Sequence, residues 1–149
     1  MKIHIASDHA GIELKAKLIN SLKHNFEILD HGPGTPDSVD YPDFADKVCR
    51  NLKTQDNQPT LNEFGILICG SGQGMALRAN KFAAIRAALV YNDEIAKLSR
   101  EHNNANIICI GARFCDFDSA LKWIRIFAET PFAQGRHQTR VAKVSAPTA

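Results

Sequence analysis

The sequence lacks a long apolar run and carries little net charge. Lysine and arginine total 18 against 16 acidic residues, a formal net charge of +2, which is too small for the broad basic surface that attracts nucleic acid. No stretch approaches the roughly 20 apolar residues of a membrane-spanning helix, and the short apolar segment at the N-terminus meets Asp8 before it could act as a secretory leader. We therefore expect a cytoplasmic protein with no nucleic-acid or membrane partner, in which any recognition of an anion is local.

The four cysteines also lack a metal-binding or redox pattern. There is no CxxC pair, and the six histidines lie elsewhere in the sequence, so the spacing indicates neither a zinc site nor a disulfide framework. Reduced thiols are the simplest interpretation, and we expect no metal and no cofactor. Cysteines in apolar segments are usually buried and inert, which is our expectation for Cys49 and Cys109.

Apolar segments alternate with helical patterns along the 149 residues. Composition and flanking turn residues predict strands over residues 2–7, 26–30, 64–69, 84–90 and 106–111. Apolar residues at helical spacing predict a further helix that starts near Met75 and helices at about 11–22, 41–52, 93–103 and 117–129. This alternation indicates an α/β fold for residues 1–149, a single domain with a doubly wound, Rossmann-like parallel sheet of five strands. The polar and basic residues 131–149 are expected to form a C-terminal arm.

Open parallel sheets bind ligands beyond the carboxyl ends of their strands. That rule places residues 7–9, 69–74 and 111–113 on one rim of the sheet. Asp8 at this rim is equally suited to capping the following helix and to contacting a ligand.

The segment ICGSGQG, residues 68–74, places a thiol directly before three glycines at alternate positions. Glycines allow unusual backbone conformations and let amide N–H groups approach a ligand, so an anion or a developing oxyanion would fit there. The spacing lacks the GK[ST] of a nucleotide-binding loop. A thiol near a helix N-terminus and cations ionises readily, and proton abstraction beside a carbonyl needs a base together with donors for the oxygen. Cys69 is therefore a candidate base or nucleophile.

Two arginines in RHQTR lie four residues apart and would share one face of a helix. The planar guanidinium of arginine matches phosphate oxygens well. Arg136 and Arg140 are therefore candidates for phosphate binding, and the alternative is a solvated basic tail.

Seven segments together resemble the type B ribose-5-phosphate isomerases of the ribose/galactose isomerase family. In chain order they are SDHAG (7–11), DYPDFA (40–45), ICGSGQGM (68–75), NKFAAIRAA (80–88), SREHNNANI (99–107), GAR (111–113) and GRHQTRV (135–141). The resemblance covers nearly the whole chain. It implies a metal-independent aldose–ketose isomerisation of a sugar phosphate by a homodimer, sometimes paired into tetramers. It also implies active sites made from both subunits, so the arm, about residues 131–149, is expected to reach a partner subunit.

The resemblance further implies a role for each matching residue. Cys69 would be the base that moves a proton between C1 and C2 of the sugar, and Ser71 would assist proton movement at the oxygens. His102 would open the furanose ring, with Asn103 beside it as a sugar contact. The other implied contacts are to the substrate, from Asp8, His9, Gly70, Gly72, Gln73 and Gly74, and to its phosphate, from Arg113, Arg136, His137 and Arg140. Gln73 departs from the family pattern, where an apolar residue or Asn is expected, and this difference bears on sugar preference.

We therefore predict an enzyme that interconverts ribose 5-phosphate and ribulose 5-phosphate through an enediolate, in the non-oxidative branch of the pentose phosphate pathway. Two alternatives remain open. One is a hexose-phosphate isomerase of the same family that acts on galactose 6-phosphate or allose 6-phosphate. The other is a non-catalytic module that binds a sugar phosphate or nucleotide, because a sheet and glycines do not by themselves establish a reaction.

Overall fold

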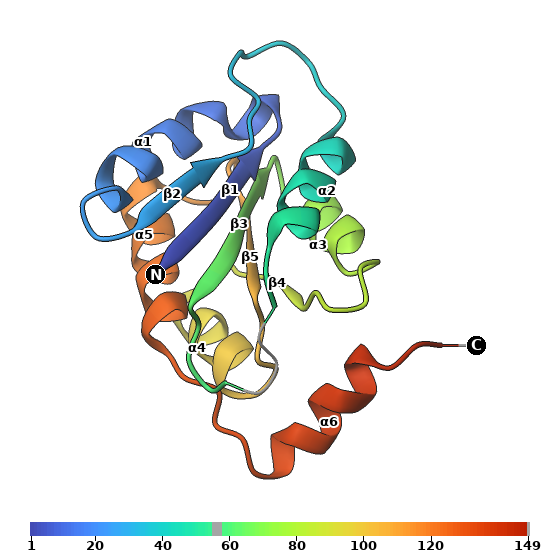
Figure 1. Cartoon of the computed structure of the whole chain (residues 1–149). Coiled ribbons are helices and arrows are strands. Elements are labelled where there is room, and N and C mark those ends of the chain that lie inside the picture. Colours follow the sequence, from blue (N-terminus) through green and yellow to red (C-terminus); the bar gives the residue numbers. More distant parts are fainter. Residues whose placement is uncertain (55–57, 149) are drawn as a thin grey trace.

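The computed structural model describes residues 1–54 and 58–148, and its centre is a parallel sheet with helices on both faces (Figure 1). The strands are β1 (Lys2–Ser7), β2 (Glu27–Asp30), β3 (Glu63–Cys69), β4 (Ala87–Leu89) and β5 (Ile107–Gly111). They pair in the order β2-β1-β3-β5-β4, and every pairing is parallel. The five predicted strands and the doubly wound, Rossmann-like α/β fold are confirmed.

Strand β4 is shorter than the predicted segment 84–90. Before it, the Ile85 amide donates to the carbonyl of Phe82 in a turn, and the Arg86 amide donates to the side-chain oxygen of Asn106. These amides are satisfied outside a strand-to-strand ladder, so pairing begins only at Ala87.

The helices follow the strands as expected, with differences at their ends. They are η1, a 3-10 turn (His9–Gly11), α1 (Ile12–Leu22), α2 (Tyr41–Asn51), α3 (Gln73–Ala79), α4 (Asp93–Glu101), α5 (Phe117–Glu129) and α6 (Arg136–Ser145). The turn η1 was not predicted; it forms because the Asp8 carboxylate accepts from the amide of Ala10 at 2.9 Å. Helix α3 begins at Gln73 rather than near Met75, immediately after Gly72 turns the chain with a φ of 78°.

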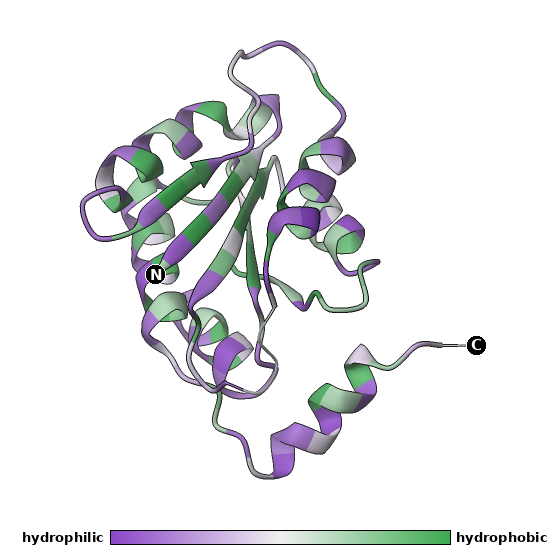
Figure 2. Cartoon of the chain, in the orientation of Figure 1, coloured by the Kyte–Doolittle hydropathy of each residue, from purple (hydrophilic) through white to green (hydrophobic). Residues whose placement is uncertain are grey.

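Each face of the sheet packs against its own set of helices. One core joins the sheet to α1, α4 and α5, and the other joins it to α2 and α3. Strand β3 serves both, because Ile66 and Ile68 enter the first core while Leu67 and Cys69 enter the second. Hydrophobic colour is accordingly concentrated along the strands in Figure 2. Each fully buried isoleucine of this strand contributes about 1.5–3 kcal/mol relative to an exposed one.

The order of the strands creates a switch point between β1 and β3. From β1 the chain first adds β2 on one side, and then crosses back to place β3 on the other side of β1. The crevice between such oppositely directed connections, beyond the carboxyl ends of the strands, is the usual ligand site of this architecture. Here the pairing of Ser7 with Ile68 brings the ends of β1 and β3 together.

Helix α6 differs from the other helices because it has no buried residue. Figure 1 shows it reaching away from the sheet and from the helices that cover it. Across residues 1–54 and 58–148, none of the helices combines the length and apolar character needed to cross a bilayer.

Candidate functional site

Three neighbouring strand ends form the rim that the sequence predicts. The Asp8 amide donates to the carbonyl of Ile68 at 2.9 Å, which joins the end of β1 to that of β3. On the other side of β3, the Ala112 amide donates to the carbonyl of Cys69 at 2.9 Å. Residues after β1, β3 and β5 are therefore held side by side, and we call Asp8, His9, residues 69–74 and Arg113 the rim group.

Asp8 and His9 occupy the β1 end of the rim group. The Asp8 carboxylate is buried and caps η1, so the capping role considered for it is confirmed. His9 is exposed, and its Nδ1 accepts from the amide of Val39 at 3.4 Å. That contact joins the rim to the loop that precedes α2, and the first residue of α2, Tyr41, packs over Gly74. This loop and α2 therefore border one side of the rim.

Cys69 ends β3 with its side chain turned toward the glycine loop. The Gly72 amide donates to its Sγ at 3.2 Å, and the residue keeps 5% of its surface exposed. The turn of residues 69–72 brings that amide back to the sulfur, and the left-handed φ of Gly72 then directs the chain into α3. The thiol and the donors proposed for an oxyanion thus lie in one tight bend.

The other buried cysteines are in a different situation. Burial raises the pKa of the Cys49 thiol to about 12, and burial also raises the pKa of Cys109 well above its usual value. Both residues belong to the core beneath α2 and α3. They are neutral packing residues, as expected from the sequence.

Arg113 brings a positive charge to the loop. Its amide donates to the carbonyl of Gly70 at 3.1 Å. A side chain on Gly70 would come within 3.0 Å of the Arg113 guanidinium, so the cation lies directly against the glycine backbone. Since Arg113 is exposed, this guanidinium is available to an anion at the rim.

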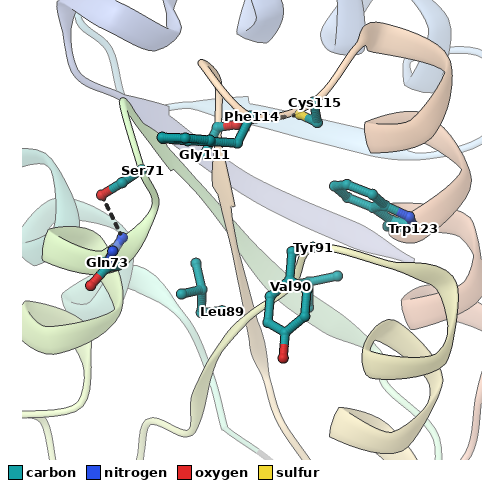
Figure 3. A pocket seen from close by; sticks show the side chains of 9 residues that line it. All are labelled: Ser71, Gln73, Leu89, Val90, Tyr91, Gly111, Phe114, Cys115 and Trp123. Carbon is teal, nitrogen blue, oxygen red and sulfur yellow. Dashed lines mark hydrogen bonds between the residues drawn. The ribbon is translucent and has the colours of Figure 1, made fainter.

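A hollow of about 240 Å³ opens beside the glycine loop (Figure 3). Ser71 and Gly111 lie on its wall, and the Ser71 hydroxyl accepts from the amide of Gln73 at 3.3 Å. Cys69 is not among its lining residues, which are Ser71, Gln73, Leu89, Val90, Tyr91, Gly111, Phe114, Cys115 and Trp123. Sequence reasoning missed this hollow because its apolar wall comes from segments far apart in the chain. The only hint in the sequence was an aromatic residue soon after each of two predicted strands, Tyr91 and Phe114, both of which are exposed.

The remaining predicted residues form a second group near the opposite end of the sheet. His102 caps the end of α4 and Asn103 follows it, both before the amino end of β5. Helix α6 supplies Arg136, His137 and Arg140, and the His102 and His137 rings stack with centroids 4.3 Å apart. We call these five residues the arm group. The pKa of His137 lies below its ordinary value because of desolvation and the nearby His102, Arg136 and Arg140, with Glu101 opposing.

One chain does not bring the two groups together. The rim group lies at the carboxyl ends of the strands, whereas His102 and Asn103 precede the amino end of β5. A strand of five residues is on the order of 15 Å long. Within one chain the arm group and Cys69 therefore lie at opposite ends of the sheet, about one strand length apart.

Comparison with known proteins places this arrangement in a family. The ribose/galactose isomerase family model matches residues 3–144. The chain belongs to this family. A probable ribose-5-phosphate isomerase B of Mycoplasma pneumoniae is 41% identical over 146 residues, which are 97% of this chain and 93% of that protein.

Solved structures of family members share the fold. The ribose-5-phosphate isomerase B of Clostridium thermocellum has a TM-score of 0.89 and 42% identity, over 97% of this chain and 95% of that one. The enzyme of Mycoplasma genitalium, solved with bound ribulose 5-phosphate, has a TM-score of 0.89 and 40% identity, over 97% and 93% of the two chains. The family resemblance stated from the sequence is confirmed.

The structure also bears on metal binding. Among the residues it describes, no three His, Cys, Asp or Glu side chains are placed together to hold a metal ion.

Proposed function

We propose that this protein interconverts ribose 5-phosphate and ribulose 5-phosphate through an enediolate. The observation that carries the proposal is the position of the Cys69 thiol in a glycine loop at the switch point of the sheet. Its Sγ accepts a hydrogen bond from the Gly72 amide at 3.2 Å. Related proteins support the choice of substrate, since they are named ribose-5-phosphate isomerase B and one was solved with bound ribulose 5-phosphate. The reaction would place the protein in the non-oxidative branch of the pentose phosphate pathway.

Each residue of the rim group has a role in this proposal. Cys69, as the thiolate, removes the proton next to the carbonyl and returns it to the neighbouring carbon. The glycine-loop amides stabilise the charge that develops on the oxygen, as preorganised donors do. The Ser71 hydroxyl moves a proton between the two sugar oxygens, and Asp8 and His9 contact the sugar. Gln73 lies at the edge of the adjoining hollow, where it would affect the choice of sugar.

The arm group supplies ring opening and phosphate binding. A histidine that changes charge near neutral pH suits proton transfer between the ring oxygen and a hydroxyl, and we assign this step to His102, with Asn103 as a sugar contact. Arg136 and Arg140 are one helical turn apart on α6 and would hold the phosphate with His137 and with Arg113 of the rim group.

Because the rim group and the arm group lie far apart within one chain, a second subunit is needed to bring them together, and we therefore assign a homodimer. In a two-fold pair each subunit presents the same surface to the other, so the arm group of one subunit can complete the rim group of its partner. The exposed, unburied helix α6 supports this assignment to an arm. Two shared sites per dimer follow, with the base from one subunit and the ring-opening histidine from the other.

The base is tested by Cys69→Ala. We expect turnover of ribose 5-phosphate to fall by ~10²–10⁴, as on loss of a general base, while the fold and phosphate affinity remain. Cys49→Ala is the matched control, because it removes a thiol from the same core without touching the glycine loop. If Cys69→Ala turned over ribose 5-phosphate as fast as the unaltered protein, Cys69 would not be the base.

The shared site is tested by mixing two inactive variants. Cys69→Ala and His102→Asn should each be inactive alone, yet a randomly reassorted equal mixture should recover about a quarter of normal activity, because half of the dimers then hold one intact site of two. A mixture that stays inactive after proven exchange of subunits would show that both residues act in the same subunit.

The hexose-phosphate alternative keeps the mechanism and changes the substrate. A panel of pentose and hexose phosphates, assayed with the purified chain alone, decides between them. Higher catalytic efficiency on galactose 6-phosphate or allose 6-phosphate than on ribose 5-phosphate would favour the alternative. A non-catalytic binding module is excluded if the hydrogen on C2 of ribose 5-phosphate exchanges with deuterium from heavy water, because binding alone leaves that hydrogen in place.

A further inference from the structure

Arg100 is a fully buried cation whose hydrogen-bond partners, among the described residues, are neutral oxygens, and its guanidinium also lies over the Phe127 ring, 5.6 Å from the centroid. It lies near the end of α4 with 0% of its surface exposed. Its guanidinium donates to a side-chain oxygen and three carbonyls, those of Asn104, Ala105, Thr130 and Pro59. Burial and the nearby Arg86 lower its pKa to about 10, which leaves it charged at neutral pH. A buried charge is costly unless hydrogen bonds satisfy it, so this one needs its oxygens held in place.

Those oxygens come from three segments that meet around the arm group. Asn104 and Ala105 directly follow His102 and Asn103, while Thr130 ends α5 just before the chain turns toward α6. Pro59 belongs to the connection before β3, and its carbonyl also accepts from the amide of Phe132 at 2.8 Å. A further bond, from the Ala133 amide to the carbonyl of Glu101 at 3.0 Å, runs beside these. The start of the arm is thereby fixed to the end of α4.

A second buried arginine holds the same loop from the other side. Arg86 Nε donates to the backbone carbonyl of Asn104 at 2.9 Å, and the Arg100 guanidinium donates to the side-chain oxygen of Asn104, also at 2.9 Å. Asn104 has a φ of 47°, in the left-handed region that Asn tolerates better than most residues. Arg86 also reaches the last residue of α6, donating to the Ser145 hydroxyl at 3.2 Å. The two guanidinium groups therefore bracket Asn104, and they contact Thr130, which directly precedes the arm, and Ser145 at the end of α6.

We infer that Arg100, assisted by Arg86, is a positioning residue for the arm group: it holds the His102 loop and the start of α6 in the one arrangement that stacks His102 on His137. The inference rests on the proposed function for its kinetic consequence but not for the geometry. Arg100 is too deeply buried to touch a substrate, so it acts only through the residues it holds. Because displacement of a catalytic group by about 1 Å can cost ~10² in rate, a loose arm would lower activity while Cys69 stays intact.

The test is Arg100→Met in the full-length protein, with Arg100→Lys as the conservative variant. Arg125→Met is the matched control, because Arg125 is exposed on α5. Folding is followed by circular dichroism and thermal unfolding, the two histidines by NMR titration, and activity on ribose 5-phosphate by kcat and KM. In Arg100→Met we expect the His137 pKa to rise toward its ordinary value and kcat/KM to fall by ~10². Arg100→Lys should recover part of both, and Arg125→Met should change neither.

The histidine titration and the kinetics answer different questions. An unaltered protein without isomerase activity would refute the proposed function, and the titration would still test the positioning role. A folded Arg100→Met with unchanged histidine titration and kcat/KM would overturn the inference. Should Arg100→Met not fold, Asn104→Gly replaces it, since glycine accepts the left-handed φ and removes the side-chain amide that Arg100 contacts, while the backbone carbonyl that Arg86 contacts remains. Asn104→Gly should shift the histidine titration in the same direction to a smaller extent, and no shift there would equally overturn it.

Discussion

Replacement of Gly72 by alanine is the sharpest single test of the glycine loop. Gly72 has a φ of 78°, and a Cβ at this position would lie 2.9 Å from the Ile110 carbonyl carbon and 3.0 Å from the Gly111 amide nitrogen. Both are backbone atoms of β5, which is buried along its whole length. Neither can move without disturbing the sheet, so both the conformation and the space oppose any side chain.

The cost can be worked from these two terms. The left-handed conformation costs roughly 1–2 kcal/mol for a residue with a Cβ, and overpacking against fixed atoms adds about 1–3 kcal/mol. The sum of about 2–5 kcal/mol would lower the melting temperature of a chain of this size by about 4–20 °C. Because the Gly72 amide donates to Cys69 Sγ, the same change should also impair turnover.

Thermal unfolding and turnover should be measured on Gly72→Ala and two comparison variants. A Cβ on Gly34 would meet nothing within 4 Å, so Gly34→Ala should match the unaltered protein in both. The three atoms nearest to a Cβ on Gly70 would all belong to the Arg113 guanidinium, the closest at 3.0 Å, and this group is the end of a flexible side chain. Gly70→Ala should therefore keep the melting temperature and raise KM. A melting temperature of Gly72→Ala equal to that of Gly34→Ala would refute the reasoning.

Two further predictions concern the arm and the half-buried His31. Removal of residues 135–149 should raise KM for ribose 5-phosphate sharply and leave the far-ultraviolet spectrum of the core intact, since α6 has no buried residue; unchanged kinetics would contradict its role. The pKa of His31 is lowered by burial, by His4 and by Lys47, against the opposing effect of Asp30. The unfolded chain therefore binds a proton at His31 more readily than the folded chain does. The free energy of unfolding is unaffected by this residue above its ordinary pKa of about 6.5 and decreases as the pH falls below that value. The free energy of unfolding should be measured with urea at about pH 7.5 and pH 5.5 in His31→Asn and in His24→Asn, a change at an exposed site. The decrease between the two pH values should be smaller in His31→Asn, and equal decreases would count against this.

The sequence predicted the five strands and the parallel type of the sheet because these signals are local. The apolar run of β3 enters both cores, and the apolar stripe of α5 faces one of them, so burial follows from spacing alone. The errors lie where a tertiary bond replaces a local preference. Residues 84–86 read as strand, yet the Arg86 amide is taken by the Asn106 side chain, a partner 20 residues away.

The candidate site divides in the same way. Residues 7–9, 69–74 and 111–113 could be placed on one rim because parallel strands end on the same edge. The family resemblance named the arm-group residues, but periodicity could not say where they lie relative to Cys69. The buried oxygens around Arg100 and the hollow beside Ser71 had no local signal at all.

By itself the sequence determined the parallel α/β sheet, the family and the residues that carry the proposed chemistry, because hydrophobic spacing and motif order are properties of neighbouring residues. Only the tertiary structure decided that these residues fall into two groups at opposite ends of the sheet, that Gly72 aims its amide at Cys69, and that two buried arginines fix the loop after His102. Those facts depend on contacts between segments distant in the chain, which form only once the strands have paired and the helices have packed on them.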